Sequence, residues 1–220
     1  MSTHPVLERT YSRHRIRRQY AHVAWFYDLW GRLTEDKALD RLLELAEVDD
    51  GSAILEVGVG TGRFLAKLAA CNPSGRLEGI DLSPDMLRHA QRRLQSTAPT
   101  SHLQEADAYH LPFADNSFDL LANTYMLDLL PVSDHPTLLA EFRRVLKPGG
   151  KLLLAHFSYG TKGVNRFWYF LARHFPSLLT DCRPVELGAV LSQTGFTVLH
   201  HEEISQNTFP SAVLVAERGG

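Results

Sequence analysis

The sequence has little of what several protein classes require. Only two cysteines, Cys71 and Cys182, occur among 220 residues, so no disulfide framework can form and we expect reduced thiols in the cytoplasm. No apolar run approaches the roughly 18 residues that a membrane-spanning helix needs. Neither sign of charge dominates, with 23 Lys+Arg against 25 Asp+Glu, which argues against a nucleic-acid-binding surface. No clustered ligands predict a metal site.

Residues 1–19 differ from the rest of the chain in charge. They contain one acidic residue, Glu8, and lack the apolar core of a signal peptide. Their arginines are Arg9, Arg13, Arg15, Arg17 and Arg18. We expect a basic arm here, followed by a single domain over residues 20–220. A solvated arm and an arm that contacts anionic lipid head groups both fit this composition.

Strands and helices alternate along the chain after residue 52. Residues 53–57 are a short apolar run, typical of a strand buried on both faces of a parallel sheet, and a glycine turn and a helical pattern follow. Further strands are predicted at 76–80, 101–105, 118–123, 151–156, 196–204 and 212–216. Helices are predicted at 37–48, 64–71, from 83 onward, 136–146 and 184–194. This alternation predicts an α/β fold: a Rossmann-like, seven-stranded, mainly parallel sheet with helices on both faces.

The last two predicted strands have no helix between them. Only residues 205–211 connect them, which is too short for the crossover that parallel strands require. We therefore expect a C-terminal antiparallel hairpin.

The glycine turn and two acids form the first candidate site. Glu56 ends the first strand and Asp81 ends the second, and in a doubly wound sheet such strand ends face the ligand. Glycines let the backbone approach a ligand, and Asp81 can accept hydrogen bonds from both ribose hydroxyls. A dinucleotide fingerprint would place a third glycine at position 63, where the chain has Arg63. This spacing argues against a nicotinamide-dependent oxidoreductase, which remains an alternative.

Four segments, in this order, resemble the motifs of class I S-adenosylmethionine-dependent methyltransferases of the type 11 group. They are residues 56–62 (EVGVGTG), 79–87 (GIDLSPDML), 111–119 (LPFADNSFD) and 146–151 (LKPGGK). Within that class the chain is similar to the ubiquinone/menaquinone C-methyltransferases and the bacterial phosphatidylethanolamine N-methyltransferases. Residues 20–22, 27–28 and 182–184 are also similar to both groups.

The resemblance implies S-adenosylmethionine as cofactor and a set of contacts for it. Contacts to its methionine half would come from Glu56, Gly58, Gly60, Thr61, Gly62, Asn123 and Thr124. Contacts to its ribose and adenine would come from Asp81, Leu82, Met86, Asp107 and Ala108. Tyr20 and Tyr27 would either close over the methionine end or pack a helix in an N-terminal cap of residues 20–50.

Candidate catalytic residues lie after the fourth and fifth strands. A general base is needed only if the attacking atom arrives protonated. His156 ends an apolar strand and titrates near neutral pH, although it can equally serve as a buried strand cap. Asp128 stands in an apolar run, where a carboxylate needs a partner. Tyr125 and Tyr159 are further candidates.

The sequence leaves the methyl acceptor open. Residues 123–125 read Asn-Thr-Tyr where quinone C-methyltransferases usually show an Arg-Asn pair, which argues against a quinol ring. Residues 158–181 form an insertion rich in large apolar groups, which would cover an acceptor pocket, pack as a core helix or dip into a membrane interface. We expect a small or lipophilic acceptor. The alternatives are a phospholipid ethanolamine head group, a thiol or amine metabolite, and a non-catalytic partner that keeps the cofactor site.

Overall fold

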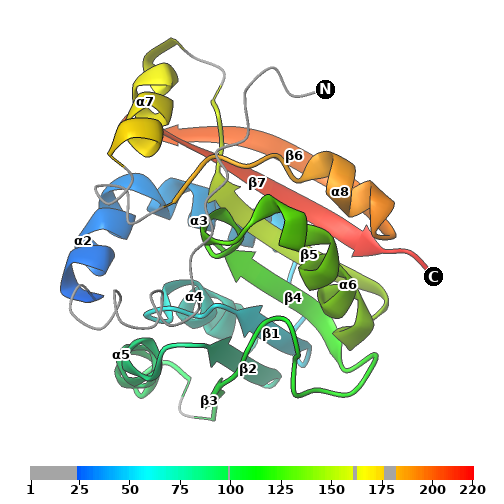
Figure 1. The fold of residues 1–220 in the computed structure, drawn as a ribbon. Coiled ribbons are helices and arrows are strands. Elements are labelled where there is room, and N and C mark those ends of the chain that lie inside the picture. Colours follow the sequence, from blue (N-terminus) through cyan, green and yellow to red (C-terminus); the bar gives the residue numbers. More distant parts are fainter. Residues whose placement is uncertain (1–23, 99, 161–162, 176–181) are drawn as a thin grey trace.

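The computed structural model describes residues 24–98, 100–160, 163–175 and 182–220, with one seven-stranded sheet (Figure 1). The strand order is β3-β2-β1-β4-β5-β7-β6, and all pairs are parallel except those that β7 makes. The strands are β1 Ala53–Val57, β2 Arg76–Asp81, β3 His102–Glu105, β4 Phe118–Thr124, β5 Leu146–Phe157, β6 Phe196–Gln206 and β7 Phe209–Arg218. This arrangement confirms the predicted fold class and the C-terminal antiparallel hairpin.

Helices cover both faces of the sheet. One buried apolar cluster joins one face to α3, α4 and α5, and a second joins the other face to α6 and α8. The helices are α2 Ala24–Thr34, α3 Asp36–Ala46, α4 Arg63–Cys71, α5 Pro84–Leu94, α6 His135–Val145, α7 Arg166–His174 and α8 Gly188–Gln193. Short 3-10 turns are η2 Leu127–Leu129, η3 Val132–Asp134 and η4 Gly163–Asn165.

A third apolar cluster joins α2 and α7 beyond the carboxyl end of β5. Trp30 of α2 meets Trp168 of α7 edge-on, with ring centroids 6.0 Å apart, and both rings pack on Phe209. Phe209 in turn stacks on Phe157 at the end of β5. Aromatic pairs of this geometry are worth about 0.5–1.5 kcal/mol beyond the area they bury. Helix α7 therefore packs on the sheet through this aromatic cluster.

The structure corrects two boundaries near the C-terminus. The predicted helix over 184–194 begins only at Gly188, because the amides of Arg183 and Val185 donate to the carbonyls of Asp128 and Phe157 instead of to a helix. The predicted connection over 205–211 shrinks to residues 207–208, both with left-handed φ values of 48° and 68°. Two such residues form the tight hairpin turn whose twist suits antiparallel strands.

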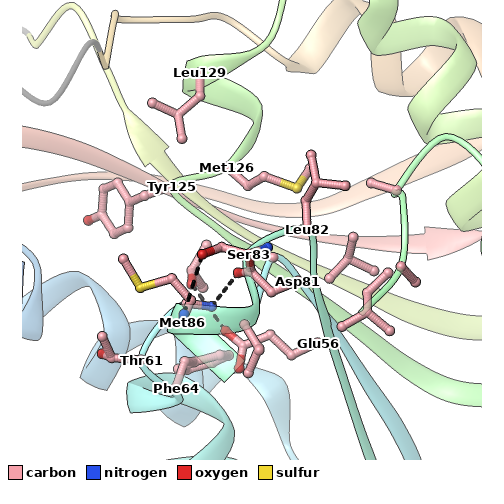
Figure 2. A pocket seen from close by; sticks show the side chains of 18 of the residues that line it. Glu56, Thr61, Phe64, Asp81, Leu82, Ser83, Met86, Tyr125, Met126 and Leu129 are labelled. Atoms are coloured by element: carbon pink, nitrogen blue, oxygen red, sulfur yellow. Dashed lines mark hydrogen bonds between the residues drawn. The ribbon is translucent and has the colours of Figure 1, made fainter. Parts of the chain in front are cut away.

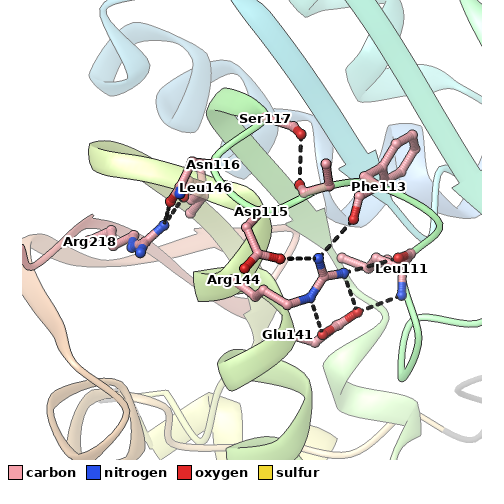
Figure 3. Close-up of polar contacts among 10 residues, drawn as sticks. Leu111, Phe113, Asp115, Asn116, Ser117, Glu141, Arg144, Leu146 and Arg218 are labelled. Atoms are coloured by element: carbon pink, nitrogen blue, oxygen red, sulfur yellow. Dashed lines mark hydrogen bonds and ion pairs between the residues drawn. The ribbon is translucent and has the colours of Figure 1, made fainter.

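Arg144 of α6 ties down the loop that precedes β4 (Figure 3). Its guanidinium donates to the carbonyls of Phe113 and Leu111 at 2.8 and 3.0 Å. It also pairs with Asp115 and with Glu141, both at 2.7 Å. Glu141 accepts from the amide of Leu111 at 2.7 Å, so the network closes on itself. These contacts therefore fix the conformation of the loop that leads into β4, which has no regular secondary structure.

We predict that Arg144→Ala lowers the free energy of unfolding by about 1.5–3 kcal/mol, because several charge-assisted hydrogen bonds are lost. Urea denaturation measures the change. Arg88→Ala is the matched control: Arg88 is exposed and pairs with Asp85 along α5, so we expect a loss below about 0.5 kcal/mol. Equal losses in the two variants would contradict the structural role of Arg144.

Candidate functional site

One pocket opens at the carboxyl ends of the central parallel strands, where the sequence places its motifs. The turns after β1, β2, β3 and β4 all contribute walls, together with residues of α3, α4 and the α2–α3 junction. Figure 2 shows Glu56, Thr61 and Phe64 at one side of the pocket, with Met126 and Leu129 across from them. The walls are mostly apolar and carry a few acidic groups, as ligand sites usually do.

The glycine turn is held in shape by Asp81. The Asp81 carboxylate accepts from the amides of Gly60 and Ser83, at 2.9 and 2.8 Å. Gly60 has a φ of 52°, and a Cβ added there would meet nothing within 4 Å, so its surface lies open. A carboxylate has about four acceptor sites. Asp81 therefore keeps acceptor capacity for a ligand after it has bound both amides.

Glu56 is a buried carboxyl whose partners are incomplete. One oxygen accepts from the Thr124 hydroxyl at 3.2 Å, and the other, Oε2, is buried without a hydrogen-bond partner in the described part of the chain. Burial raises the pKa of Glu56 from its ordinary value to about 8, and the nearby Asp81 contributes to this rise. An unpaired acceptor lining a pocket is costly unless a ligand donates to it.

The remaining cofactor candidates after β2 and β3 also line the pocket. Leu82 and Met86 follow Asp81, and the Ser83 side chain caps α5 by accepting from the Met86 amide. Asp107 and Ala108 lie in the turn after β3, where the Asp107 carboxylate accepts from the Tyr109 amide at 3.1 Å. A flat apolar wall with a carboxylate at its edge suits a purine ring and its exocyclic amine.

Two candidates face the fold instead of the pocket. Gly62 has a φ of 76°, and a Cβ there would press on the Ala90 backbone at 3.1 Å, so this glycine lets α4 approach α5. Asn123 is fully buried, and its side chain donates to the Val57 carbonyl at 2.7 Å, which links β4 to β1. The structure supports both as packing residues beside the site.

Tyr125 lines the pocket in a constrained position. Its φ is 53°, its amide donates to the Ala155 carbonyl, and its hydroxyl bonds Ser211 at 2.7 Å. Burial raises the pKa of the Tyr125 hydroxyl well above its ordinary value, so the phenol stays protonated. Thr124, the preceding residue, also lines the pocket.

His156 and Asp128 are both buried outside the pocket wall. His156 lies on the sheet face that packs on α6 and α8, and its Nδ1 bonds the Phe157 carbonyl at 3.1 Å. Desolvation lowers its pKa to about 4, so the ring is neutral. Asp128 accepts from the Phe157 amide at 2.6 Å, and burial raises its pKa well above the ordinary value. Neither side chain is placed to take a proton from a ligand in this pocket.

Several expectations fall on residues outside the described ranges. Tyr20 and the basic arm of residues 1–19 belong to them, and so does part of the insertion. The backbone of Tyr27 belongs to α2, and its side chain is not among those described. The division into arm, cap and insertion stays a prediction.

A pair of charged residues in the pocket wall was not predicted from the sequence as part of a site. Glu35, between α2 and α3, and Arg63, at the start of α4, form an ion pair at 3.1 Å, and Arg63 also pairs with Asp36. Gly31 makes room for it, since a Cβ there would lie 1.5 Å from an Arg63 nitrogen. Burial raises the pKa of Glu35 to about 7 despite the opposing effect of Arg63.

The comparisons with known proteins agree with the geometry. Residues 54–150 match the family described as "Methyltransferase domain". The chain is 31% identical to an O-methyltransferase, cnsE, of Penicillium expansum, over 91% of this chain and 73% of that protein. It is 34% identical to a demethylmenaquinone methyltransferase of Bacillus velezensis, over 60% of this chain and 57% of that protein.

Solved structures share the fold. A SAM-dependent methyltransferase from Aquifex aeolicus superposes with a TM-score of 0.65 at 17% identity, over 94% of this chain and 99% of that one. The chain spans about half the length of several curated relatives that it matches, for example 48% of an uncharacterized protein from Haemophilus influenzae. Within the described ranges, no cluster of metal-ligating side chains occurs and no helix has the length and apolarity to cross a bilayer.

We predict that Glu56→Gln flattens the dependence of stability on pH. The folded-state pKa of Glu56, about 8, lies above its ordinary 4.5. Between these values the folded chain holds a proton that the unfolded chain has released, so the wild-type free energy of unfolding falls as pH rises from about 5 to 8. Glutamine has no proton to lose.

Urea denaturation at pH 5, 6, 7 and 8 tests this. The advantage of Glu56→Gln over the wild type should grow steadily with pH. Glu44→Gln serves as control, because Glu44 is exposed and paired with Arg41. Parallel curves for the wild type and Glu56→Gln would show that Glu56 is not buried as described.

Proposed function

Because the chain belongs to the class I S-adenosylmethionine-dependent methyltransferases, we propose that it transfers a methyl group from S-adenosylmethionine to a small or lipophilic acceptor. The observation that carries this proposal is Oε2 of Glu56, which lies in the wall of the pocket beside the glycine turn and has no hydrogen-bond partner among the described residues. The ammonium group in the methionine half of the cofactor would donate the hydrogen bond that this carboxylate oxygen lacks. Pairing with it would favour the ionised form of Glu56.

The other residues of this edge fit the same cofactor. Asp81 has acceptor capacity for two ribose hydroxyls, and Leu82, Met86 and Asp107 offer a slot with one polar edge. The open backbone at Gly60 leaves space that any side chain would fill. When bound, the cofactor supplies an electrophilic methyl group on a sulfonium, so the protein's task is to align the acceptor and exclude water.

The acceptor end of the pocket is lined differently. Leu39, Leu129 and Leu130 provide apolar walls, and Tyr125 is held rigidly by its bond to Ser211. These walls support an acceptor with an apolar body. A phospholipid ethanolamine head group and a thiol or amine metabolite remain alternatives, distinguished by a panel of acceptors with labelled cofactor.

Binding of the cofactor tests the proposal. Titration calorimetry should show saturable binding of S-adenosylmethionine and S-adenosylhomocysteine to the wild type. Asp81→Asn should weaken binding by about 1.5–3 kcal/mol, the range for hydrogen bonds to charged groups. Asp119→Asn is the matched control, because Asp119 also anchors a backbone amide, that of Ala53, but outside the pocket. No binding of either ligand by folded wild type would sink the proposed function.

A peripheral membrane contact is a further part of the proposal, supported by α7. Its outer face exposes Phe167 and Phe170, at 57% and 49%, while Trp168 faces the aromatic cluster. The helix contains no acidic residue and ends with Arg173 and His174. An apolar face flanked by cations suits the interface of an anionic bilayer.

Cosedimentation with vesicles measures this contact. We expect binding to phosphatidylglycerol vesicles that weakens in high salt, and little binding to phosphatidylcholine vesicles. The double variant Phe167→Ser/Phe170→Ser should lose binding. Leu199→Ser removes an equally exposed apolar side chain from β6 and should keep it. Equal sedimentation of all three proteins with both lipids would refute the α7 contact.

A further inference from the structure

The pocket wall contains a further carboxyl group, that of Glu35, to which the proposed cofactor contacts assign no role. Glu35 lines the pocket with a side chain that is 14% exposed, and its Oε2 accepts from Arg63 at 3.1 Å. No other hydrogen bond reaches its carboxylate from the described residues. Since Arg63 also binds Asp36, one guanidinium serves two carboxylates. Glu35 is therefore only partly neutralised, in a wall that is mostly apolar.

The acidic groups of the pocket fall into two separate sets. Glu56 interacts electrostatically with Asp81, at the edge assigned to the cofactor. Glu35 instead acts on Tyr125 and Asp128, and raises the pKa of both. Tyr125 lines the pocket, as does Leu39, whose amide donates to the Glu35 carbonyl at 3.0 Å, so Glu35 belongs to the end where the acceptor would bind. The two carboxyls, Glu56 and Glu35, thus serve different ends of one pocket.

A purely structural role for Glu35 is the competing explanation. Its ion pair with Arg63 joins the α2–α3 junction to α4, and a clamp of this kind needs no ligand. Asp36 makes the same type of contact with the same guanidinium, is 34% exposed, and does not line the pocket. A comparison of substitutions at Glu35 and at Asp36 therefore separates the structural effect of the ion pair from a role inside the pocket.

We propose that Glu35 binds the attacking group of the methyl acceptor and takes its proton, so that the acceptor is an apolar molecule with a hydroxyl or thiol. This inference rests on the proposed function. In the transfer, a heteroatom lone pair forms a bond to the methyl carbon. The carbon–sulfur bond breaks, and sulfur keeps its electron pair. The heteroatom's proton passes to the Glu35 carboxylate, which leaves a neutral acid and a methyl ether or thioether.

The pH dependence follows from the state of Glu35. Burial holds its pKa at about 7, so the ionised form that can accept a proton appears as the pH rises through neutrality. The titratable and charged groups that face Glu35 are Arg63 of α4, Asp36 of α3, Tyr125 after β4 and Asp128 of η2. Tyr125 stays protonated across this range, because burial raises the pKa of its hydroxyl further above its ordinary value, and burial also raises the pKa of Asp128.

Binding of two matched probes tests the proposal without knowledge of the natural acceptor. The full chain is saturated with S-adenosylhomocysteine and titrated with 2-naphthol or with 2-fluoronaphthalene, which has a similar shape and no donor. The wild type should prefer 2-naphthol by about tenfold or more, as expected for a hydrogen bond to a charged acceptor. That preference should grow between pH 6 and 8. Glu35→Gln should lose the growth with pH and most of the preference, while Asp36→Asn keeps both.

Each other result counts against the proposal. Equal affinity of the wild type for the two probes, or no binding of 2-naphthol at all, would overturn it. The same loss in Glu35→Gln and Asp36→Asn would reduce Glu35 to a clamp. S-adenosylhomocysteine binding is measured first in every variant, so failure of the cofactor site appears as loss of that binding and is distinct from failure of the Glu35 assignment.

Discussion

The ligand-facing edge of this protein depends on the Asp81 carboxylate. It accepts from the amides of Gly60 and Ser83, and so joins the turn after β1 to the start of α5 after β2. Two adjacent parallel strands would otherwise end in independent loops. Burial raises the pKa of this carboxyl, but the backbone amides compensate in part by favouring its charged form. The same carboxylate that shapes the turn also lines the pocket, where we propose that it binds the ribose of the cofactor.

The two ends of the pocket are built on different principles. The proposed cofactor end is made by short segments in which neighbouring residues both shape the backbone and face the pocket, as at Gly60 and Asp81. The proposed acceptor end assembles side chains that lie far apart in sequence, among them Glu35, Tyr125 and Leu129. Tyr125 belongs both to this wall and to the aromatic cluster that α2 and α7 share. The packing of α7 thereby reaches a residue of the pocket wall.

The sheet and the cofactor edge could be predicted because their signals are local. An apolar run followed by a glycine turn predicts that the turn lies at a strand end, and Asp81 ends the next strand. Glu35 and Arg63 gave no such signal: an acidic residue before an amphipathic helix is typical of an ordinary helix start. Arg63 was informative only because it occupies the position where a dinucleotide fingerprint would have its third glycine. His156 shows a second limit, since strand alternation says that neighbours point to opposite faces but not which face holds the ligand. The start of α8 was misplaced because tertiary bonds to Asp128 and Phe157 hold the backbone out of a helix.

The ion pair between Glu35 and Arg63 depends on the absence of a side chain at Gly31. A Cβ at this position would occupy the place of the Arg63 guanidinium and would also lie 2.8 Å from Glu35. Positions 31 and 63 therefore form a steric unit across two helices that share no sequence neighbourhood. A side chain introduced at 31 would displace the Arg63 guanidinium, and this would move the counter-ion away from Glu35. The charge in this wall of the pocket would thus change through a helix position that carries no functional group at all.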